Sequence, residues 1–288
     1  MSVPRMRRTQ VFARDAYPLH SDRRRVDLPV PPHAHDFCEV AVIVSGHATY
    51  RTRHGNRRVG RGDVVAVRPG SWHEYRAVAD LDVLNVYLGP ELLAADVAWI
   101  LDHPRLTNLL FGTGDMRLRL SPAATDRTRC WLEQLALCRT HPEANQSLQL
   151  RSLLGCVFAE FAGAASGASP AGRTVTPATR TVLLAMAQDP ARAWTATELA
   201  ALAGVSSSHL QHQFAGQLGV SPFGWLAQYR SEQMAVRLAA TDAPVAEIGR
   251  AVGWPDPNYA TRRFRATYGI PPTEYRRKFA FATALPAG

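Results

Sequence analysis

Lysine is almost missing from this sequence. Lys278 is the only lysine among 33 basic residues, so arginine carries nearly all of the positive charge in a chain whose net charge is +9. Arginine suits phosphate recognition because its guanidinium group is a planar fork of donors. The chain is also very rich in alanine, and biased codon usage explains most of the arginine content. Nucleic acid is the default acidic partner of a basic protein, but net charge alone does not establish it.

Cysteine is scarce, and long apolar runs are absent. The four cysteines, Cys38, Cys130, Cys138 and Cys156, form no C-x-x-C pair, which excludes a disulfide framework and suits a reducing compartment. The first twenty residues are basic but have no apolar h-region, so we expect no secretory signal. No segment approaches the ~18 uninterrupted apolar residues of a membrane span. We therefore expect a cytoplasmic protein without a membrane partner.

At 288 residues the chain is long enough for two domains, and its composition changes where they meet. Small residues, glycine and proline dominate GAASGASPAGRTVTPA at residues 163–178, and we place a linker at residues 166–178. Upstream, residues 29–90 contain short valine- and tyrosine-rich strands separated by turns, a pattern typical of an all-β barrel or sandwich. Residues 1–28 are then an N-terminal arm.

Residues 91–165 change to a helical period. Their apolar residues recur at spacings of three and four, which indicates amphipathic helices. These residues are Trp131, Leu135 and Cys138 in one helix and Leu150, Leu154, Val157 and Phe161 in the next. The second stripe fits a dimer seam and packing onto the chain's own barrel equally well. We expect the segment to carry dimerisation, so a second copy of the chain is a predicted partner.

The sequence beyond the linker contains an internal repeat. Residues 198–222 align with residues 247–272, and the offset between the copies grows by one residue at the turn. The matched pairs are Glu198 and Glu247, Gly204 and Gly253, Phe214 and Phe264, Gly219 and Gly269, and Pro222 and Pro272. One supersecondary unit therefore occurs twice.

Each copy of the unit predicts a helix, a glycine-marked turn and a second helix. Ser206 is a good N-cap in the first copy, and Asp256 followed by Pro257 starts the second helix of the other. The pattern predicts that the core-facing residues are Leu210 and Phe214 in one copy and Tyr259 and Phe264 in the other. The opposite face carries hydrogen-bonding side chains, which suit base edges in the major groove of DNA.

A single helical hairpin is weak evidence for DNA binding, because such hairpins are common in other proteins. Two copies joined by the helical segment FGWLAQYRSEQMAVRLAAT, with the basic segment YRRKF after the second, strengthen it. The candidate DNA-contacting residues are Ser207, Ser208, Gln211, His212, Asn258, Thr261, Arg262, Arg265, Arg276 and Arg277.

About a hundred C-terminal residues, which contain both units, resemble the AraC/XylS family of transcription regulators. SPFGWLAQYRSEQMAVRL resembles the family's linker helix, with Arg230 at its usual arginine. The signature positions matched are Ala246, Gly253, Tyr259, Arg262, Phe264, Gly269, Pro272 and Tyr275, whereas His212, Ala260 and Trp254 depart from the usual residues. The change at His212 weakens the expected base or phosphate contacts of the first unit, and the other two concern core packing.

The family resemblance implies how the domain binds DNA. Residues 179–280 would form the DNA-binding domain, followed by a tail at residues 281–288. Its two recognition helices would enter successive major grooves of double-stranded promoter DNA. RNA polymerase would be a further partner, with activation favoured over repression.

The segments HAHDFCEVAVIVSG and GDVVAVRPGSWH resemble the two cupin motifs. By this resemblance His33, His35, Glu39 and His73 stand where metallo-cupins hold a metal, and such ligands suit Fe, Mn, Ni or Zn. The second motif departs from the pattern, because one residue is missing before His73 and the usual asparagine after it is absent.

Three interpretations of these histidines remain open: a catalytic metal, a metal held for structure or sensing, and a metal-free effector pocket. We favour the last, because in regulators resembling this chain the cupin domain binds the effector. We expect no enzymatic activity and no cofactor. The candidate effector-binding residues are His33, His35, Glu39, Trp72, His73, Tyr75, Asn85 and Tyr87. Trp72 and Tyr75 fit rim or core positions equally well, and resemblance to the rhamnose-responsive branch suggests a sugar.

The predicted fold class is α+β: a cupin-like β-barrel at residues 29–90 with a C-terminal helical extension, linked to an all-α DNA-binding domain of two helix-turn-helix units. Effector binding would shift the equilibrium between two arrangements of the domains, to the extent that the effector binds one arrangement better.

Overall fold

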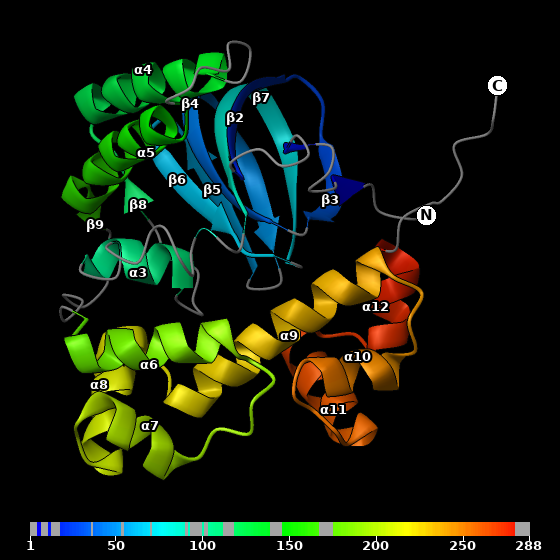
Figure 1. The fold of residues 1–288 in the computed structure, drawn as a ribbon. Helices are drawn as coiled ribbons and strands as arrows, with labels where there is room; N and C mark the ends of the chain where they lie inside the picture. Colours follow the sequence, from blue (N-terminus) through cyan, green and yellow to red (C-terminus); the bar gives the residue numbers. More distant parts are fainter. Residues whose placement is uncertain are drawn as a thin grey trace.

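The computed structural model describes residues 5–6, 11–12, 18–35, 37–52, 55–69, 71–89, 92, 100, 103–111, 118–138, 146–166 and 175–279. These residues form a sheet-rich N-terminal domain (residues 18–166) and a helical domain (residues 175–279), as Figure 1 shows. The predicted α+β class is confirmed. Among the described residues, no helix is long and apolar enough to cross a membrane.

The N-terminal domain is built on one curled, nearly all-antiparallel sheet. Its strands are β1 (Arg5–Met6), β2 (Leu19–Val26), β3 (Val30–His35), β4 (Cys38–Thr52), β5 (Gly55–Gly60), β6 (Asp63–Val67), β7 (Trp72–Leu88), β8 (Leu118–Arg119) and β9 (Ala165–Ser166). They run in the order β1-β3-β7-β4-β6-β8-β9, while β2 also pairs with β7 and β5 with β4. Among the described strands, only β1 and β3 pair in parallel.

The two longest strands, β4 and β7, bend together in the middle. Their register shifts three times between Ile43 and Thr49, and Gly46 has a positive φ of 70°. A Cβ atom at Gly46 would lie 2.1 Å from the carbonyl oxygen of Asp80, so this crossing of backbones requires glycine. The bend lets one half of β7 pair with β2 and the other half with β3.

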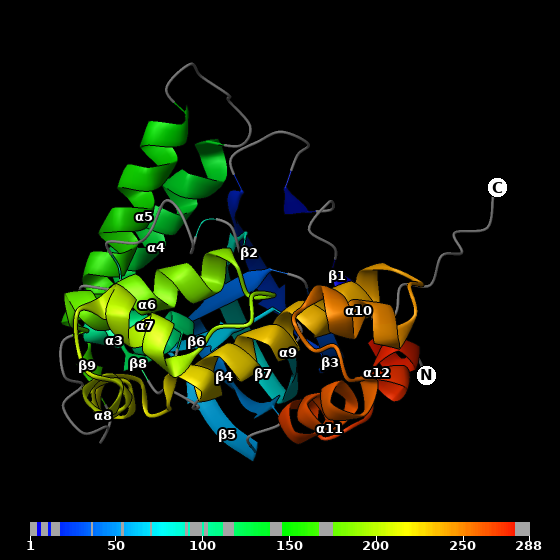
Figure 2. The same ribbon diagram turned by 60° about the horizontal axis from the view of Figure 1, so that its bottom comes forward.

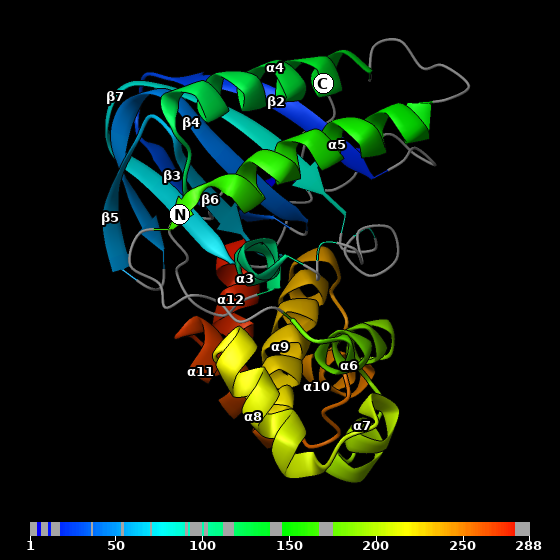
Figure 3. The same cartoon turned by 90° about the vertical axis from the view of Figure 1, so that its left-hand side faces the viewer.

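Both faces of the first half of β4, residues 38–44, are buried, as expected for a strand between two layers. Val40, Val42 and Val44 join a cluster with helices α3 (Pro104–Phe111), α4 (Pro122–Cys138) and α5 (Gln146–Gly163). Ala41 and Ile43 point into the interior of the curled sheet. Figures 1 and 3 show α4 and α5 lying against one side of the sheet.

The stripe on α5 packs inside its own chain. Leu150, Leu154, Val157 and Phe161 are at most 5% exposed and belong to the same core cluster as β4. The alternatives left open by the sequence are thereby decided in favour of intramolecular packing, so any dimer contact of this segment must use other residues.

Two predicted boundaries differ from the structure. The arm assigned to residues 1–28 contains β2, whose eight residues all pair with β7, so the sheet begins well before residue 29. The segment 91–165 includes strand β8 and reaches the start of β9, in addition to its helices.

The helical domain contains α6 (Pro177–Gln188), α7 (Ala196–Ala203), α8 (Ser207–Leu218), α9 (Pro222–Ala240), α10 (Val245–Ala251), α11 (Pro257–Tyr268) and α12 (Pro272–Phe279). The repeat takes the form of two helix-turn-helix units, α7–α8 and α10–α11. The side chains of Ser206 and Asp256 cap α8 and α11 as predicted. In Figure 2, α9 runs across the end of the sheet and joins the two units.

Candidate effector pocket and DNA-binding helices

A cavity of about 740 Å³ opens between β2, β3, β4 and β7 of the N-terminal domain. Six of the eight predicted effector-binding residues line it: His33, Glu39, His73, Tyr75, Asn85 and Tyr87. His35 is buried beside the cavity, 3.2 Å from the carboxylate of Glu39. Trp72 does not line it and packs instead against an apolar cluster of the helical domain. The pairing of β3 and β4 with the bent β7 therefore gathers residues that the sequence separates by up to 54 positions, from His33 to Tyr87.

The cavity wall also includes residues that the sequence did not predict. Strand β2 contributes Asp22 and three consecutive arginines, Arg23 to Arg25. Their sequence signal is weak, because LHSDRRRV is too highly charged to suggest a strand. Arg24 pairs with Asp22 at 2.9 Å, so the wall carries charge of both signs.

A hydrogen-bond network fixes one side of the cavity. The hydroxyl group of Tyr87 and the amide nitrogen of Asn85 both donate to Asp22 Oδ1, at 2.8 and 3.1 Å. Among the described residues, Asn85 Oδ1 and the hydroxyl oxygen of Tyr75 are buried without a hydrogen-bond partner. Burial raises the pKa of Tyr75 and of Tyr87 well above the usual range, so both phenols stay neutral. The cavity thus offers an unused acceptor and an unused donor, which together suit a hydroxyl-bearing ligand.

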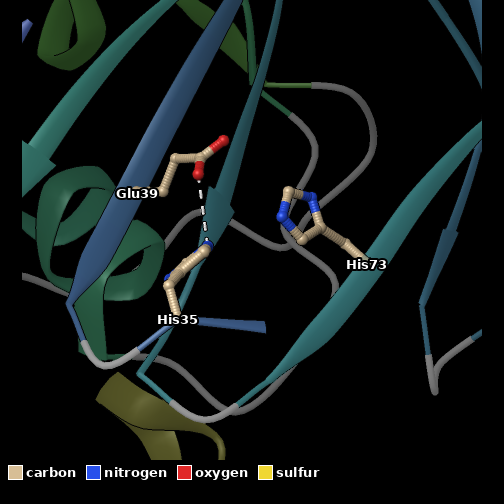
Figure 4. A group of neighbouring side chains, drawn as sticks. All are labelled: His35, Glu39 and His73. Carbon is tan, nitrogen blue, oxygen red and sulfur yellow. Dashed lines mark ion pairs between the residues drawn. The ribbon is translucent and has the colours of Figure 1, made fainter. Parts of the chain in front are cut away.

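The histidines form a second polar cluster, of which Figure 4 shows His35 and His73 with Glu39. His35 Nδ1 lies 2.8 Å from the carbonyl oxygen of Phe37, and His33 Nδ1 lies 3.0 Å from that of Pro31. A carbonyl oxygen can only accept, so we assign the proton of each ring to Nδ1. The Nε2 atom of His35 then directs its lone pair at Glu39 Oε2. Two acceptors at this distance repel unless a proton or a cation lies between them.

His73 completes this cluster. It is fully buried, and within the described residues neither of its ring nitrogens has a hydrogen-bond partner. Burial, together with the neighbouring His33 and His35, lowers the pKa of His73 well below its usual value. Burial is also the main cause of the lowered pKa of His33. Both rings are therefore neutral at pH 7 and have a lone pair available.

The cluster fits a divalent transition metal. Ligand atoms of His35, Glu39 and His73 lie within 4.8 Å of one another, and all three residues are buried. Two imidazoles and one carboxylate suit such ions, and a ring N–H donated to a backbone carbonyl is the usual support of a metal-bound histidine. His35, Glu39 and His73 would hold the metal, with the His33 ring 4.1 Å from that of His73.

The outward faces of α8 and α11 carry most of the predicted DNA-contacting residues. The exposed ones are Ser208, Gln211 and His212 on α8, Asn258, Arg262 and Arg265 on α11, and Arg277 on α12. Ser207 and Thr261 are partly exposed, and the hydroxyl group of Ser207 donates to Ala196 O, which ties α8 to α7.

Arg276 has different partners from those its position in the sequence suggests. Its guanidinium group donates to the carbonyl oxygens of Leu238 and Ala243. The side chain therefore fastens α12 to the end of α9. This is a structural role, and it leaves Arg277 as the exposed arginine of this pair.

The core prediction for Tyr259 is wrong. Tyr259 is 41% exposed and meets the edge of Trp254, whereas Ala260 is fully buried. The buried stripe of α11 is Ala260, Phe264 and Tyr268, so Tyr259 lies one position off it. Ala260 packs closely against α10, because a Cβ added at Gly249 would lie only 3.2 Å from the Cβ of Ala260.

Arg230 of α9 connects the two helix-turn-helix units. Its three nitrogens donate to the carbonyl oxygens of Pro190 and Arg192, which precede the first unit, and of Gly253, which lies in the turn of the second. The distances are 2.7, 2.7 and 3.1 Å. One side chain thereby fixes how the units are oriented relative to each other.

Comparison with known proteins matches both parts of the chain described above, the domain with the cavity and the helix-turn-helix units. Residues 20–166 match the model of the AraC-like ligand binding domain, and residues 199–278 match a helix-turn-helix domain. The HTH-type transcriptional activator RhaR of Enterobacter sp. (strain 638) is 25% identical over 283 residues, which cover 96% of this chain and 98% of the relative. RhaR of Cronobacter sakazakii is 25% identical over 281 residues, covering 95% and 96%.

Solved structures agree at the level of the fold. ToxT of Vibrio cholerae superposes with a TM-score of 0.52 over 91% of this chain and 99% of its own, at 11% identity. The matched families and relatives are regulators and not enzymes, in agreement with the expectation from the sequence. Because one family model spans half of the chain and the other spans its helix-turn-helix units, the chain belongs to the AraC family of ligand-responsive transcription regulators.

Proposed function

We propose that this regulator binds double-stranded promoter DNA through α8 and α11 and senses a small, hydroxyl-bearing effector in the cavity of its N-terminal domain. The observation that carries the proposal is the cavity itself, since six side chains predicted from the sequence meet there. The buried, unused acceptor of Asn85 and donor of Tyr75 support a polyol such as a sugar.

The DNA half of the proposal can be tested by selecting bound sequences from a random duplex library with the full-length protein at low salt. We expect enrichment of a sequence with two half-motifs in successive major grooves, about 10 base pairs apart. Failure to enrich any sequence would contradict the proposal. Cytoplasmic location, homodimerisation and recruitment of RNA polymerase belong to the same proposal, and sedimentation of the purified protein tests the dimer.

The effector half can be tested by thermal-shift screening of the full chain against a panel of neutral sugars, sugar acids and aromatic acids. We expect the neutral sugars to include the stabilising compounds, since the unused groups of the cavity are an acceptor and a neutral donor. Stabilisation only by aromatic acids would point to a different effector class.

A metal-assisted pocket is a second candidate, favoured by the arrangement of His35, Glu39 and His73. A bound divalent metal would supply a positive charge that attracts effector oxygens, while the three side chains orient it. Elemental analysis of the purified protein, and the visible absorption of Co²⁺ added to metal-free protein, test this candidate. Absorption that is absent from the wild type, or equally strong in Glu39→Gln, would remove it.

A further inference from the structure

The outward surface of the sheet carries a cluster of arginines that lies outside the cavity. In the rows formed by β5, β4 and β7, Arg58 lies opposite Thr49, and Thr49 lies opposite Arg76. The next residue of β4, Tyr50, is 2% exposed and points into the interior of the curled sheet. Successive residues of a strand point to opposite faces, so Thr49 and Arg51 point outward. Arg51, Arg58 and Arg76 therefore share one outward surface, which we call the basic face.

One carboxylate holds two of these three arginines. The two carboxylate oxygens of Glu74 lie 2.6 Å from Arg51 and 3.1 Å from Arg76, and the side chain of Glu74 is only 3% exposed. The side chain of Arg76 remains 56% exposed. Arg58 is exposed, and it forms no ion pair with the part of the chain that the structure describes. Three positive charges therefore gather around a single negative charge, which leaves the basic face with a net positive charge.

Protection of a sheet edge does not account for this cluster. Within the described residues β5 pairs only with β4, and edge strands often carry charges that keep them from pairing with other chains. That role explains Arg58 on β5. It does not explain Arg51 and Arg76, which lie on the interior strands β4 and β7. Like charges on neighbouring strands are unfavourable by themselves, so their gathering favours an acidic partner.

The basic face lies on the side of the molecule that carries the recognition helices. Strand β5 shares the lower edge of Figure 2 with α8 and α11 and lies between them there, and all three lie toward the left in Figure 3. The packing of β7 accounts for this placement. Trp72 packs against the apolar cluster of α9 to α12, and Glu74 and Arg76 follow on the same face of the strand. At about 3.3 Å per residue, Arg76 lies roughly 13 Å along the strand from that contact.

This position suits the backbone of a bound duplex. A major groove that admits a recognition helix is about 12 Å wide, and phosphates line both of its edges. A duplex that receives α8 and α11 in successive major grooves passes β5 between them, so phosphates of its central segment face the arginines. The planar fork of a guanidinium group matches the oxygens of a phosphate.

We propose that the basic face is a second DNA-binding surface, which contacts phosphates of the promoter duplex between the two half-motifs. This inference rests on the proposed function. Arg58 and Arg76 make the phosphate contacts, and Glu74 orients the guanidinium group of Arg76 beside that of Arg51. The N-terminal domain thereby contributes to DNA affinity without reading the sequence, because phosphate contacts position a protein on the duplex and carry no base information.

The test titrates the full-length protein with the duplex enriched by the selection described above, at salt concentrations between about 50 and 200 mM. The double variant Arg58→Gln with Arg76→Gln should reduce the slope of log affinity against log salt by about 1.8, since each phosphate contact contributes about 0.9. Over this range the wild type should lose about tenfold more affinity than the double variant. Arg51 is kept, so that Glu74 retains a partner.

Two further variants serve as controls. Arg127→Gln with Arg129→Gln also removes two arginines, but from α4, which lies on the far side of the sheet from the helical domain (Figure 1), so the slope should stay that of the wild type. Arg58→Lys with Arg76→Lys keeps both positive charges and should retain most of the slope. Thermal unfolding of each variant checks that it is folded.

Uncharged phosphates locate the contact on the duplex. Methylphosphonate groups placed one at a time between the half-motifs should weaken binding by the wild type more than binding by Arg58→Gln with Arg76→Gln. Equal salt slopes in these two proteins, or equal sensitivity to every central methylphosphonate, would overturn the second surface and leave the proposed function standing. Failure of every protein to enrich any duplex would overturn both.

Discussion

Arg262 and Arg277 are both exposed arginines of the helical domain, but they occupy different positions on the DNA-binding face. Arg262 projects from the middle of α11, and among the described side chains it forms no ion pair. If Arg262 contacts a guanine edge, Arg262→Ala should weaken binding by roughly 1–3 kcal/mol and relax the preference at one base pair. Binding to a library of single-base variants of the selected duplex measures this. An equal loss at every position would mean that Arg262 contacts phosphate.

Arg277 provides the comparison for Arg262. It lies on α12 beyond the second unit, where contact with phosphate is expected. Arg277→Ala should weaken binding to all sequences about equally and reduce the slope of log affinity against log salt by about 0.9. Arg276→Ala is expected to lower the stability of the α9–α12 contact instead, since its partners are backbone carbonyls.

The buried imidazole of His73 predicts how stability depends on pH. In the unfolded chain its pKa is about 6.5, so it takes up a proton as the pH falls below that value. In the folded protein the pKa lies well below 6.5, and the ring stays neutral. The unfolded state then binds more protons, and the free energy of unfolding falls with decreasing pH by up to about 1.4 kcal/mol per unit below pH 6.5.

The comparison of the wild type with His73→Gln isolates this contribution. Urea unfolding of both proteins between pH 7.5 and 5, with EDTA in every buffer, should show a steeper loss of stability in the wild type. Parallel curves would mean that His73 is protonated in the folded state.

Residue types in the pocket could be predicted because their spacing resembles known motifs, but the direction of each side chain could not. Trp72 and His73 are neighbours in the sequence, and only His73 reaches the cavity. Strand alternation sends neighbours to opposite faces, and which face is inside depends on the register of β3 with β7. That register is set by contacts distant in the sequence.

At the scale of elements, the turns of the two helix-turn-helix units are equivalent in sequence and differ in their surroundings. Gly204 and Gly253 both have positive φ, at 65° and 91°. A Cβ at Gly204 meets nothing within 4 Å, whereas at Gly253 it would lie 2.7 Å from the carbonyl oxygen of Ala191 and 2.8 Å from the guanidinium group of Arg230.

Gly204→Ala should therefore cost only the backbone strain, about 1–2 kcal/mol. Gly253→Ala should cost more, because it also clashes with the backbone at Ala191 and displaces Arg230, which changes the orientation of the two units. Thermal unfolding and DNA affinity of both variants measure this difference. Equal losses in the two variants would show that Ala191 and Arg230 both tolerate the added methyl group.

The helical elements were predictable because their signals are local. Caps such as Ser206 and Asp256 and the glycine at each turn lie within a few residues of the helices that they end. Strand β2 was not predictable, because its sequence is highly charged and its pairing with β7 is made across more than 50 residues of chain. The bend of β4 at Gly46 was not predictable either, because it depends on the close approach of Asp80, which is distant in the sequence.

At the scale of the whole molecule, the contact between the domains joins residues from distant parts of the chain. Ala34, Arg68, Phe111, Trp225 and Glu232 come from four separate elements or loops. None of them has a sequence signal, since a single alanine or glutamate is common in any domain. Their arrangement places the helical domain directly against the strands that form the wall of the cavity.

The most direct test of this account is the affinity of the full chain for the selected duplex, measured with and without a compound that stabilises the protein in the thermal-shift screen. The wild type should bind about tenfold more tightly with the compound. The double variant His35→Ala with Glu39→Ala should keep the fold and still bind DNA, but its DNA affinity should not change when the compound is added. The same DNA affinity with every stabilising compound, or an undiminished response in the double variant, would contradict a regulator governed by this cavity.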